Sequence, residues 1–267
     1  MTPSAPPPTE AEIVLALRRA GSVFAEDEAA LLVVEAGSSA ELGRMVERRV
    51  TGEPLEVIVG WAEFCRLRVA IEAGVFVPRR RTEFLVSLAS RLVTPSSVVV
   101  DLCCGSGALG LAIATAVPGL RLLASDIEPR SVRCARTNLA SIGEVFEGDL
   151  YEPLPTELRG SVDVLVVNAP YVPTSAIELM PPEARLYEPQ IALDGGADGL
   201  DIHRRVAAEA GGWLAAGGTL LIETSEEQAD AAGAMFEQAG LRARVEHSEE
   251  YDATVVVGTW TPRDASN

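Results

Sequence analysis

The chain has no lysine, few histidines and few cysteines, and these shortages narrow what it can do. Only two histidines occur among its 267 residues, His203 and His247, far apart in the sequence. The four cysteines form no C-x-x-C pair and have no histidine cluster nearby; they are Cys65, Cys103, Cys104 and Cys134. This spacing lacks the ligand pattern of a zinc site and the framework of a disulfide-stapled protein. We therefore expect no metal site, and cysteines that act as small, partly buried apolar residues.

Long apolar runs are also missing. Stretches such as Val162–Val167 are far shorter than the roughly 20 residues of a membrane-spanning helix. The first residues, MTPSAPPPTE, lack the basic and apolar regions of a secretory signal. We expect residues 1–8 to be a disordered leader, residues 261–267 to be a tail, and the protein to be cytoplasmic, without membrane contact.

Positive charge is scarce as well. All 22 basic side chains are arginines, and they face 39 acidic residues, which gives a formal net charge of −17. Proteins that bind nucleic acid gain most of their affinity by neutralising phosphates. The charge therefore argues against nucleic acid as the direct substrate, although the local cluster Arg79–Arg81 leaves that class open.

The first third of the chain is predicted to be helical and then to form a hairpin. Residues 9–50 show helical apolar spacing in TEAEIVLALRRA, AEDEAALLVVEAG and SAELGRMVERRV. Residues 51–81 carry β-type residues on both sides of Gly60–Glu63, which predicts a hairpin there that links the helices to the next domain. Thr82, which follows the arginine cluster, is expected to be an N-cap.

Residues 82–260 then alternate between strands and helices. Seven strands are expected, in SVVVD, RLLASD, EVFEGD, VDVLVV, GTLLIET, LRARVEHS and TVVVGTW. The alternation predicts an α/β fold with a mostly parallel sheet and helices on both faces. The last two strands have no helix between them, which predicts an antiparallel edge strand. Ligands of such sheets bind beyond the carboxyl ends of the strands.

The loop after the first of these strands is rich in glycine and raises two interpretations. Gly105 to Gly110 spell G-x-G-x-x-G, the dinucleotide fingerprint. However, Asp101 ends the strand and would repel a pyrophosphate, whereas it suits the amino group of S-adenosylmethionine. Asp126, at the end of the second strand, would accept hydrogen bonds from ribose hydroxyls with either kind of cofactor. The residues favour S-adenosylmethionine but leave a nicotinamide or flavin cofactor, or a purely structural loop, as alternatives.

A second motif, Asn168-Ala169-Pro170-Tyr171, follows the buried strand VDVLVV directly. An amide nitrogen is a poor nucleophile because its lone pair is conjugated. The Asn168 side-chain oxygen and the Ala169 carbonyl would hold its two N–H groups and aim the nitrogen at a methyl sulfonium, and Tyr171 would pack against the flat group. Catalysis would then rest on positioning and electrostatics. An Asx-type turn at a strand end is the structural alternative.

From about Arg48 to Gly258 the sequence resembles the HemK/PrmC family of protein-(glutamine-N5) methyltransferases. The similar segments are RRVTGEPLEVIVGWAEF, VFVPRRRTEFLV, DLCCGSGALGLAIA, NAPYVP and YEPQIALDGGADGLDIHRR. The last is the most specific, because amino-methyltransferases that act on DNA generally lack it. The resemblance implies a class I, Rossmann-like fold that uses S-adenosylmethionine to methylate a glutamine side-chain amide in a protein, typically a peptide chain release factor. It also implies that residues 9–50 help to dock that protein.

The resemblance assigns roles to individual residues. The cofactor-binding residues would be Asp101, Cys103, Gly105, Gly107, Asp126, Ile127, Asp149, Leu150 and Asn168. The acceptor amide would be held by Asn168, Ala169, Pro170 and Tyr171, and the substrate would be contacted by Arg79 and Glu188. Four positions depart from the family pattern: Cys103 replaces a glycine, Ala169 replaces a proline, and arginines occupy positions 80 and 81.

These departures keep other functions open. A relative redirected to a small-molecule or peptide amine fits them, as does an inactive module that only binds S-adenosylmethionine. An adenine-N6 methyltransferase of DNA or RNA shares the Asn-x-Pro-Tyr chemistry, but the charge counts against it. His203, in the helix that begins near Gly199, is expected on the surface rather than in catalysis.

Overall fold

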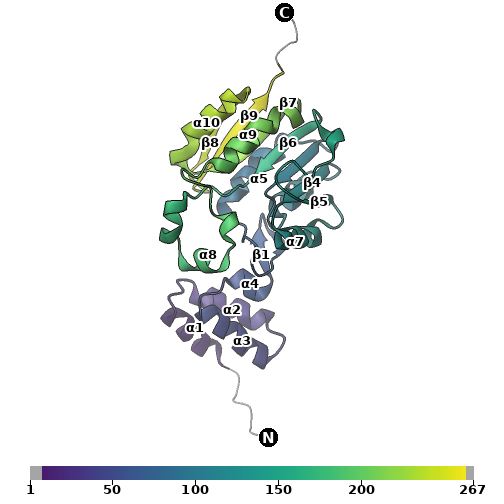
Figure 1. The fold of residues 1–267 in the computed structure, drawn as a ribbon. Helices are drawn as coiled ribbons and strands as arrows, with labels where there is room; N and C mark the ends of the chain where they lie inside the picture. Colours follow the sequence, from purple (N-terminus) through teal and green to yellow (C-terminus); the bar gives the residue numbers. More distant parts are fainter. Residues whose placement is uncertain (1–7, 263–267) are drawn as a thin grey trace, which may run out of the picture.

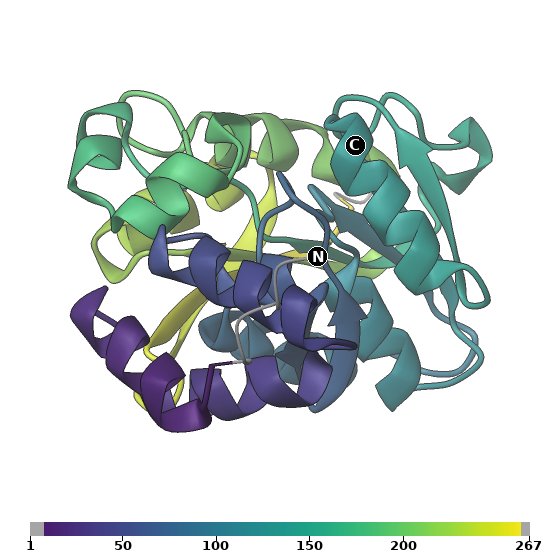
Figure 2. The same cartoon turned by 90° about the horizontal axis from the view of Figure 1, so that it is seen from below.

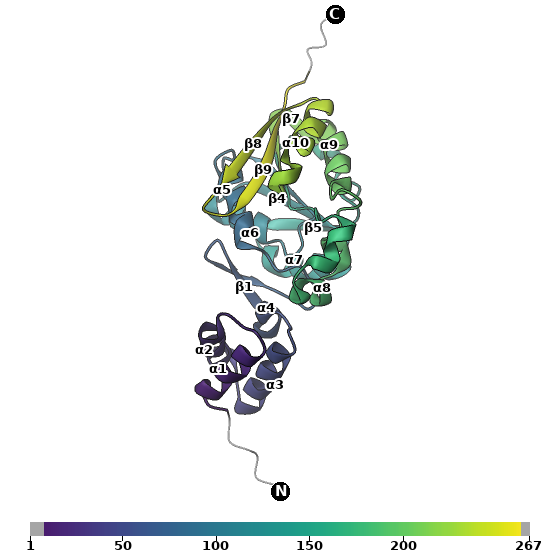
Figure 3. The same ribbon diagram turned by 90° about the vertical axis from the view of Figure 1, so that its left-hand side faces the viewer.

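The computed structural model describes residues 8–262, which form a small helical cluster and a larger sheet domain (Figure 1). The proposed leader and tail therefore lie almost entirely outside the described residues. The cluster comprises α1 (Glu10–Arg19), α2 (Ala25–Glu35), α3 (Ser39–Val50) and the short α4 (Leu55–Val59). Its core includes Leu17, Leu32 and Ile58. Figure 3 shows this cluster below the sheet domain, joined to it through α4 and the β1 strand.

The expected hairpin is present, but its turn lies further along the chain than predicted. β1 (Trp61–Phe64) pairs with β2 (Leu67–Ala70), and the turn is made by Cys65 and Arg66, whose φ angles are 50° and 62°. The preceding segment, Leu55–Val59, is helical rather than a strand because Ile58 packs into the core of the cluster. Tertiary packing here overrides the β propensity of the valines. Gly60, at φ 83°, ends that helix in the left-handed conformation.

The helix after the arginine cluster begins differently from expectation. A 3-10 turn, η1 (Arg80–Thr82), leads into α5 (Glu83–Ser90), and the Thr82 side chain makes no capping hydrogen bond. Thr82 is instead fully buried and turned toward the interior of the domain. The N-cap role predicted for its side chain is therefore wrong.

The seven-stranded sheet has the order β5-β4-β3-β6-β7-β9-β8, and β9 is antiparallel to both of its neighbours. Its strands are β3 (Val98–Leu102), β4 (Arg121–Asp126), β5 (Gly143–Glu147), β6 (Val162–Val167), β7 (Leu214–Thr224), β8 (Leu241–Ser248) and β9 (Ala253–Trp260). The predicted fold class is confirmed. The antiparallel strand lies one place in from the edge, where it is flanked by β7 and β8.

Helices cover both faces of this sheet. α5, α6 (Ala108–Ala116) and α7 (Pro129–Leu139) contribute to one core, and α9 (Asp201–Trp213) and α10 (Ala229–Gln238) contribute to the other. Alternate residues of β3 point to opposite faces, so Val99 belongs to the first core and Val100 to the second. This two-sided burial explains the near-continuous apolar runs of the strands.

Between β6 and α9 the chain makes a long excursion, residues 172–198, which we call the crossing segment. It contains η3 (Thr174–Leu179), α8 (Pro182–Tyr187) and η4 (Gln190–Ala192). Two other short 3-10 turns are η2 (Thr156–Leu158) and η5 (Glu226–Gln228). Figure 2 shows the green crossing segment beside the helical cluster, and Arg49 of α3 bonds Glu183 of α8 at 3.1 Å. Among residues 8–262, none of the helices has the length and apolar character needed to cross a membrane.

Candidate active site

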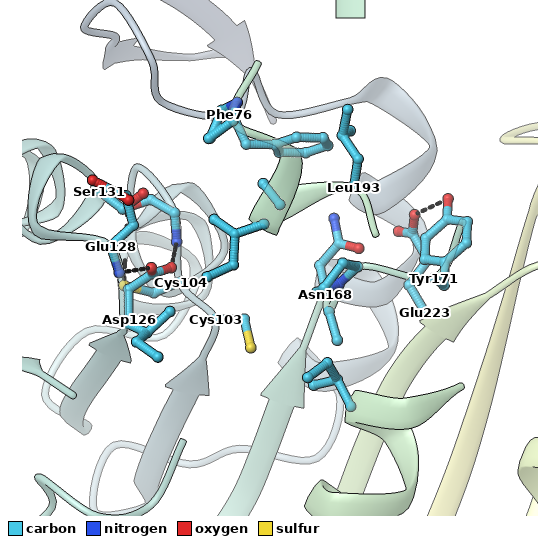
Figure 4. A pocket seen from close by; sticks show the side chains of 18 of the residues that line it. Phe76, Cys103, Cys104, Asp126, Glu128, Ser131, Asn168, Tyr171, Leu193 and Glu223 are labelled. Atoms are coloured by element: carbon cyan, nitrogen blue, oxygen red, sulfur yellow. Dashed lines mark hydrogen bonds between the residues drawn. The ribbon is translucent and has the colours of Figure 1, made fainter. Parts of the chain in front are cut away.

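The carboxyl ends of β3, β4 and β6 open onto one cavity of about 330 Å³ (Figure 4). Most of the residues singled out in the sequence line it: Arg79, Cys103, Gly105, Asp126, Ile127, Asp149, Leu150, Asn168, Ala169, Pro170 and Tyr171. Asp101, Gly107 and Glu188 are not among the lining residues. The cavity lies where open α/β sheets bind their ligands.

The glycine loop, residues 103–107, bends around the carboxylate of Asp126. The Gly105 N–H donates to Asp126 Oδ2 and the Glu128 N–H donates to Asp126 Oδ1, both at 2.8 Å. Burial raises the pKa of this carboxyl, although those backbone hydrogen bonds oppose the rise. Each carboxylate oxygen keeps acceptor capacity toward the cavity, as hydroxyl donors require.

Cys103 occupies a backbone position that favours glycine, with φ at 55°. Its side chain lines the cavity and also packs against the second core. Burial and nearby carboxylates raise the pKa of the Cys103 thiol far above its usual range. The thiol is therefore protonated and apolar in character, not a nucleophile.

Asp101 lies behind the glycine loop rather than in the cavity lining. Its Oδ2 accepts the Gly110 N–H at 3.0 Å, and its side chain is fully buried. Burial and the nearby Asp126 charge raise the pKa of Asp101 to about 7, although the hydrogen bond from the Gly110 N–H acts to lower it. A Cβ at position 110 would lie 3.1 Å from Leu122 and 3.2 Å from the Asp101 carboxylate, so Gly110 allows close packing of α6 on the sheet.

The far side of the cavity carries an ion pair. Arg205 of α9 bonds Asp149 at 2.6 Å, and both line the cavity beside Leu150. The Leu150 carbonyl is held by the Ser125 hydroxyl at 2.8 Å. Ile127 lies at the rim, half-exposed.

The acceptor loop, residues 168–171, leaves β6 at the opposite end of the cavity. The Asn168 Nδ2 donates to the Thr82 hydroxyl at 3.3 Å. No donor within residues 8–262 bonds the Asn168 Oδ1 or the Ala169 carbonyl oxygen, so both acceptors are available to a ligand. The Tyr171 hydroxyl donates to Glu223 at 3.1 Å, as Figure 4 shows.

Glu223 and Thr82 are functional candidates that were missed in the sequence. Glu223 is the next-to-last residue of β7, is 2% exposed and lines the cavity. Burial raises the pKa of Glu223, and the nearby Thr82 and Tyr171 hydroxyls and the Arg81 charge oppose that rise. The signal was an acidic residue near the end of an apolar strand, the same feature that singled out Asp101 and Asp126.

Two glycines in the crossing segment and its junction with α9 pack directly on the acceptor loop. A Cβ on Gly195 would lie 2.7 Å from the Pro170 carbonyl oxygen, and one on Gly199 would lie 2.2 Å from that of Tyr171. Gln228 donates to both the Tyr171 carbonyl, at 2.9 Å, and the Asp198 carbonyl, at 2.8 Å. The segment ALDGGADGL thus buttresses the acceptor loop.

Arg79 and Glu188, both expected to contact substrate, form an ion pair with each other. Arg79 Nη2 bonds Glu188 Oε1 at 2.5 Å, and the Glu188 side chain is almost completely buried. Burial raises the pKa of Glu188, opposed by the Arg79 charge. The pair fastens the crossing segment to the residues after the hairpin, and only Arg79 reaches the cavity.

His203 is buried, not on the surface, so that expectation is wrong. Its ring faces the sheet, and Nε2 lies 3.0 Å from the Glu223 carbonyl oxygen. Burial lowers the pKa of His203 to about 4, although the hydrogen bond to the Glu223 carbonyl acts to raise it. The periodicity of α9 did not specify that this position faces β7.

Solved structures with a similar fold are methyltransferases. A methyltransferase from Pyrococcus furiosus aligns with a TM-score of 0.56 at 12% identity, over 84% of this chain and 100% of that one. A SAM-dependent O-methyltransferase from Thermotoga maritima aligns with a TM-score of 0.51 at 15% identity, over 72% of this chain and 69% of that one. At these identities the likeness concerns the fold alone.

Sequence comparison is more specific. A family model described as "Methyltransferase small domain" matches residues 66–182. The release factor glutamine methyltransferase of Geobacter sulfurreducens is 37% identical over 199 residues, 73% of this chain and 69% of that protein. The one from Bifidobacterium longum is 33% identical over 257 residues, which are 89% of this chain and 87% of that protein. A 4-amino-L-phenylalanine/4-methylamino-L-phenylalanine methyltransferase of Streptomyces pristinaespiralis is 36% identical over 203 residues, which are 73% of this chain and 69% of that protein. The chain belongs to the HemK/PrmC family, that of the release factor glutamine methyltransferases.

Proposed function

We propose that this protein transfers the methyl group of S-adenosylmethionine to the side-chain amide nitrogen of a glutamine, with a peptide chain release factor as the acceptor protein. The observation that carries the proposal is a pair of acceptors, Asn168 Oδ1 and the Ala169 carbonyl oxygen, that lie at the end of β6 beside the cavity and that no donor of the described residues bonds. The family to which the chain belongs supports the same reaction.

The cavity fits S-adenosylmethionine. Asp126 offers carboxylate oxygens that suit ribose hydroxyls, and Leu150 and Ile127 offer apolar contact for the adenine beside Asp149. The glycine loop lets the backbone pass close to the cofactor, because among residues 8–262 no atom outside the loop's adjacent residues lies within 4 Å of a Cβ built on Gly105. When bound, the cofactor supplies the electrophilic methyl group. Asp101 would act on it indirectly, by holding α6 and the glycine loop in place.

The residues of the acceptor loop then position the nucleophile. Asn168 Oδ1 and the Ala169 carbonyl accept the two N–H groups of the glutamine amide, which turns the nitrogen lone pair toward the methyl donor. As the N–C bond forms, the bond between that methyl carbon and the sulfonium sulfur breaks, which leaves a neutral thioether, and one of the two N–H protons leaves to solvent. Positioning of this kind can supply several kcal/mol toward a barrier without a general base, roughly 7–11 in the best intramolecular cases.

We further propose that residues 9–50 dock the acceptor protein. Large apolar side chains are exposed on this cluster, among them Val23, Phe24 and Val34, which are 84%, 68% and 78% exposed. Exposed apolar groups of this kind mark interaction surfaces when they cluster. The ion pair between Arg49 and Glu183 connects the cluster to the crossing segment that lines the cavity.

A second acceptor class has its own support. The relative that acts on 4-amino-L-phenylalanine shows that a sequence this similar can belong to an enzyme for a small aromatic amine. The cavity includes apolar side chains near the acceptor loop, such as Phe76, Met180 and Leu193, which suit an aromatic ring. Methylation of 4-aminophenylalanine but not of a release factor would favour this acceptor.

Substitution of Asn168 tests the proposed reaction. In Asn168→Ala we expect the rate of labelled-methyl transfer to a release factor to fall at least about 100-fold, because one of two orienting acceptors is lost. The melting temperature should still rise on addition of S-adenosylmethionine, which shows that the cofactor site survives. Full methyl transfer by this variant would overturn the positioning mechanism.

A further inference from the structure

One side chain of α7 bonds the outer edge of the hairpin. The Ile71 N–H donates to the Gly60 carbonyl at 3.0 Å, so the pairing of the two strands continues past Ala70, the last residue of β2. Successive residues of an antiparallel strand point their backbone groups alternately toward and away from the partner, so those of Ala70 face away from β1. Asn138 Oδ1 accepts the Ala70 N–H at 2.9 Å, and Asn138 Nδ2 donates to the Ala70 carbonyl at 3.0 Å. The Asn138 amide therefore takes the place of a third strand, and Figure 1 shows α7 next to the hairpin.

The same Nδ2 group also reaches the glycine loop. It donates its second hydrogen bond to the Ser106 carbonyl oxygen at 2.8 Å. Ser106 is 3% exposed, and it lines the cavity. Because an amide nitrogen carries two protons, Asn138 can bond the hairpin and the loop at the same time.

The Ser106 carbonyl lacks the partner that a helix would give it. In a helix, the N–H of Gly110 would bond the carbonyl four residues earlier. It bonds the buried Asp101 carboxylate instead, at 3.0 Å, and α6 begins only after Gly107, whose φ is 78°. Within residues 8–262, the hydrogen bonds to the Ser106 carbonyl oxygen come from Asn138 alone. A buried carbonyl without a donor costs free energy, so this loop conformation depends on a side chain of another helix.

The hairpin that Asn138 bonds is itself fixed to the helical cluster. Gly60 alone separates α4 from β1. Arg68 of β2 bonds Glu35 of α2 at 2.7 Å and lies over the Trp61 ring, 4.1 Å from its centroid. The contacts therefore run without a break from the cluster, through the hairpin and Asn138, to the glycine loop.

We propose that Asn138 is a positioning residue for methyl transfer, which holds the glycine loop in its cofactor-binding shape by tying the Ser106 carbonyl to the end of the hairpin. This inference rests on the proposed binding of S-adenosylmethionine in the cavity. A loop that is ordered before the ligand arrives loses less conformational freedom on binding, which raises the affinity. The same joint fixes the cofactor loop relative to the helical cluster, the part proposed to dock the acceptor protein.

Two substitutions of Asn138 remove the bond to the loop in different ways. Asn138→Asp keeps the shape and an acceptor for the Ala70 N–H, but an ionised carboxylate has no proton for the Ser106 carbonyl. Asn138→Ala removes the whole amide and adds no charge. We expect the dissociation constant for S-adenosylmethionine to rise about 10-fold or more in both variants, the loss that corresponds to one buried hydrogen bond.

Cys134→Ala is the matched control. Cys134 lies one turn before Asn138 and is buried, and its thiol donates to the Ala70 carbonyl at 3.1 Å. Of the described residues, its bonding partners are Ala70 and, at 3.9 Å, Asn138 Nδ2, not the glycine loop. The melting temperature should fall by roughly 2–8 °C in Cys134→Ala, as in Asn138→Ala, while its cofactor affinity stays within about twofold of wild type. Thr137→Ala, on the exposed side of α7, should change neither quantity.

The order of the glycine loop, measured without ligand, is a readout that packing of α7 on the hairpin does not change. NMR relaxation of the Gly105, Ser106 and Gly107 amides should give order parameters of about 0.85 in wild type and in the Cys134→Ala and Thr137→Ala variants. In both Asn138 variants the values should fall below about 0.6, which is typical of a flexible backbone.

Two results would overturn the inference. One is unchanged loop order in both Asn138 variants. The other is an equal loss of cofactor affinity in Cys134→Ala and Asn138→Ala, which would show that packing on the hairpin is sufficient. A wild-type chain that binds no S-adenosylmethionine would refute the proposed cofactor, and the relaxation measurement would still decide whether Asn138 holds the loop.

Discussion

The Gln228 side chain donates a hydrogen bond to the carbonyl oxygen of Tyr171 at 2.9 Å and a second one to that of Asp198 at 2.8 Å. One amide group thereby joins the acceptor loop to the start of α9. The geometry is possible because Gly199 leaves room for both, since a Cβ there would lie 2.3 Å from the Gln228 side chain. The acceptor loop is therefore held from behind by Gln228 and Gly199, which are not among the residues that line the cavity.

Substitution of Gly199 tests this support. Gly199→Ala places a Cβ 2.2 Å from the Tyr171 carbonyl oxygen at a φ of +79°, so we expect a loss of roughly 2–3 kcal/mol in the free energy of unfolding. Methyl transfer should fall more than cofactor affinity, because the acceptor loop moves and the glycine loop does not. Gly233→Ala is the control, since position 233 lies in α10 with nothing within 4 Å of a Cβ. Equal stability of the two variants in chemical denaturation would contradict this account.

Asp126 is expected to decide cofactor affinity. In Asp126→Asn the Gly105 and Glu128 N–H groups lose a charged acceptor, and the ribose loses one as well. We expect the dissociation constant for S-adenosylmethionine to rise about 10- to 100-fold in calorimetry, the loss typical of hydrogen bonds to a charged group. Asp230→Asn, on the exposed side of α10, should leave it unchanged.

The pH dependence of binding gives the same residue a second test. Burial raises the pKa of Asp126, so wild-type affinity should weaken as the pH falls through that raised value and the carboxyl becomes neutral. The Asp126→Asn variant lacks this titration. A rise in melting temperature with NADH but not with S-adenosylmethionine would show that the cavity holds a different cofactor.

His203 should make stability depend on pH. Its pKa is lowered to about 4 in the folded protein, whereas an unfolded histidine titrates near 6.5. Between these values the unfolded state binds a proton that the folded state does not, so folding stability is present above pH 6.5 and is lost as the pH falls toward 4. The size is roughly 3 kcal/mol over that window. Denaturation of His203→Gln should show a smaller slope there, and an unchanged slope would contradict the buried placement.

Arg49 is expected to hold the helical cluster together. It bonds both oxygens of Glu28, at 2.7 and 2.9 Å, and reaches Glu183 of the crossing segment. Arg49→Ala leaves the mostly buried Glu28 without its partner, which should cost roughly 2–3 kcal/mol. Arg44→Ala, on the exposed side of the same helix, should change stability by less than about 0.5 kcal/mol. Melting temperatures of the two variants compare them directly, and equal values would refute the role given to Arg49.

The sequence was enough to predict the sheet and the ends of its strands. Alternating apolar segments with polar residues after them, such as Asp126 and Asn168, indicate a mostly parallel sheet and the edge at which a ligand binds, but not the order of the strands. These signals are local, because each lies in one strand and the loop that follows it. Cys103 and Leu150, which were assigned to the cofactor by the family resemblance, also line the cavity.

Contacts between distant segments could not be predicted in this way. Thr82 and Asn168 are 86 residues apart, and Arg79 and Glu188 are 109 apart, so no local pattern indicates that either pair meets. The helical state of Leu55–Val59 depends on packing against the cluster, and the inward side of His203 depends on how α9 docks on β7. Each of these features is decided by tertiary structure rather than by propensity.

The central claim is methyl transfer to a glutamine side chain of a protein, and one parallel measurement tests it most directly. This protein and methyl-labelled S-adenosylmethionine are incubated in three parallel reactions, each with a different acceptor. The acceptors are an unmodified release factor, the same factor in which the glutamine of its Gly-Gly-Gln motif is replaced by alanine, and DNA. We predict label in the first release factor alone. Label in DNA alone, or equal label in the glutamine and alanine forms of the release factor, would contradict the account.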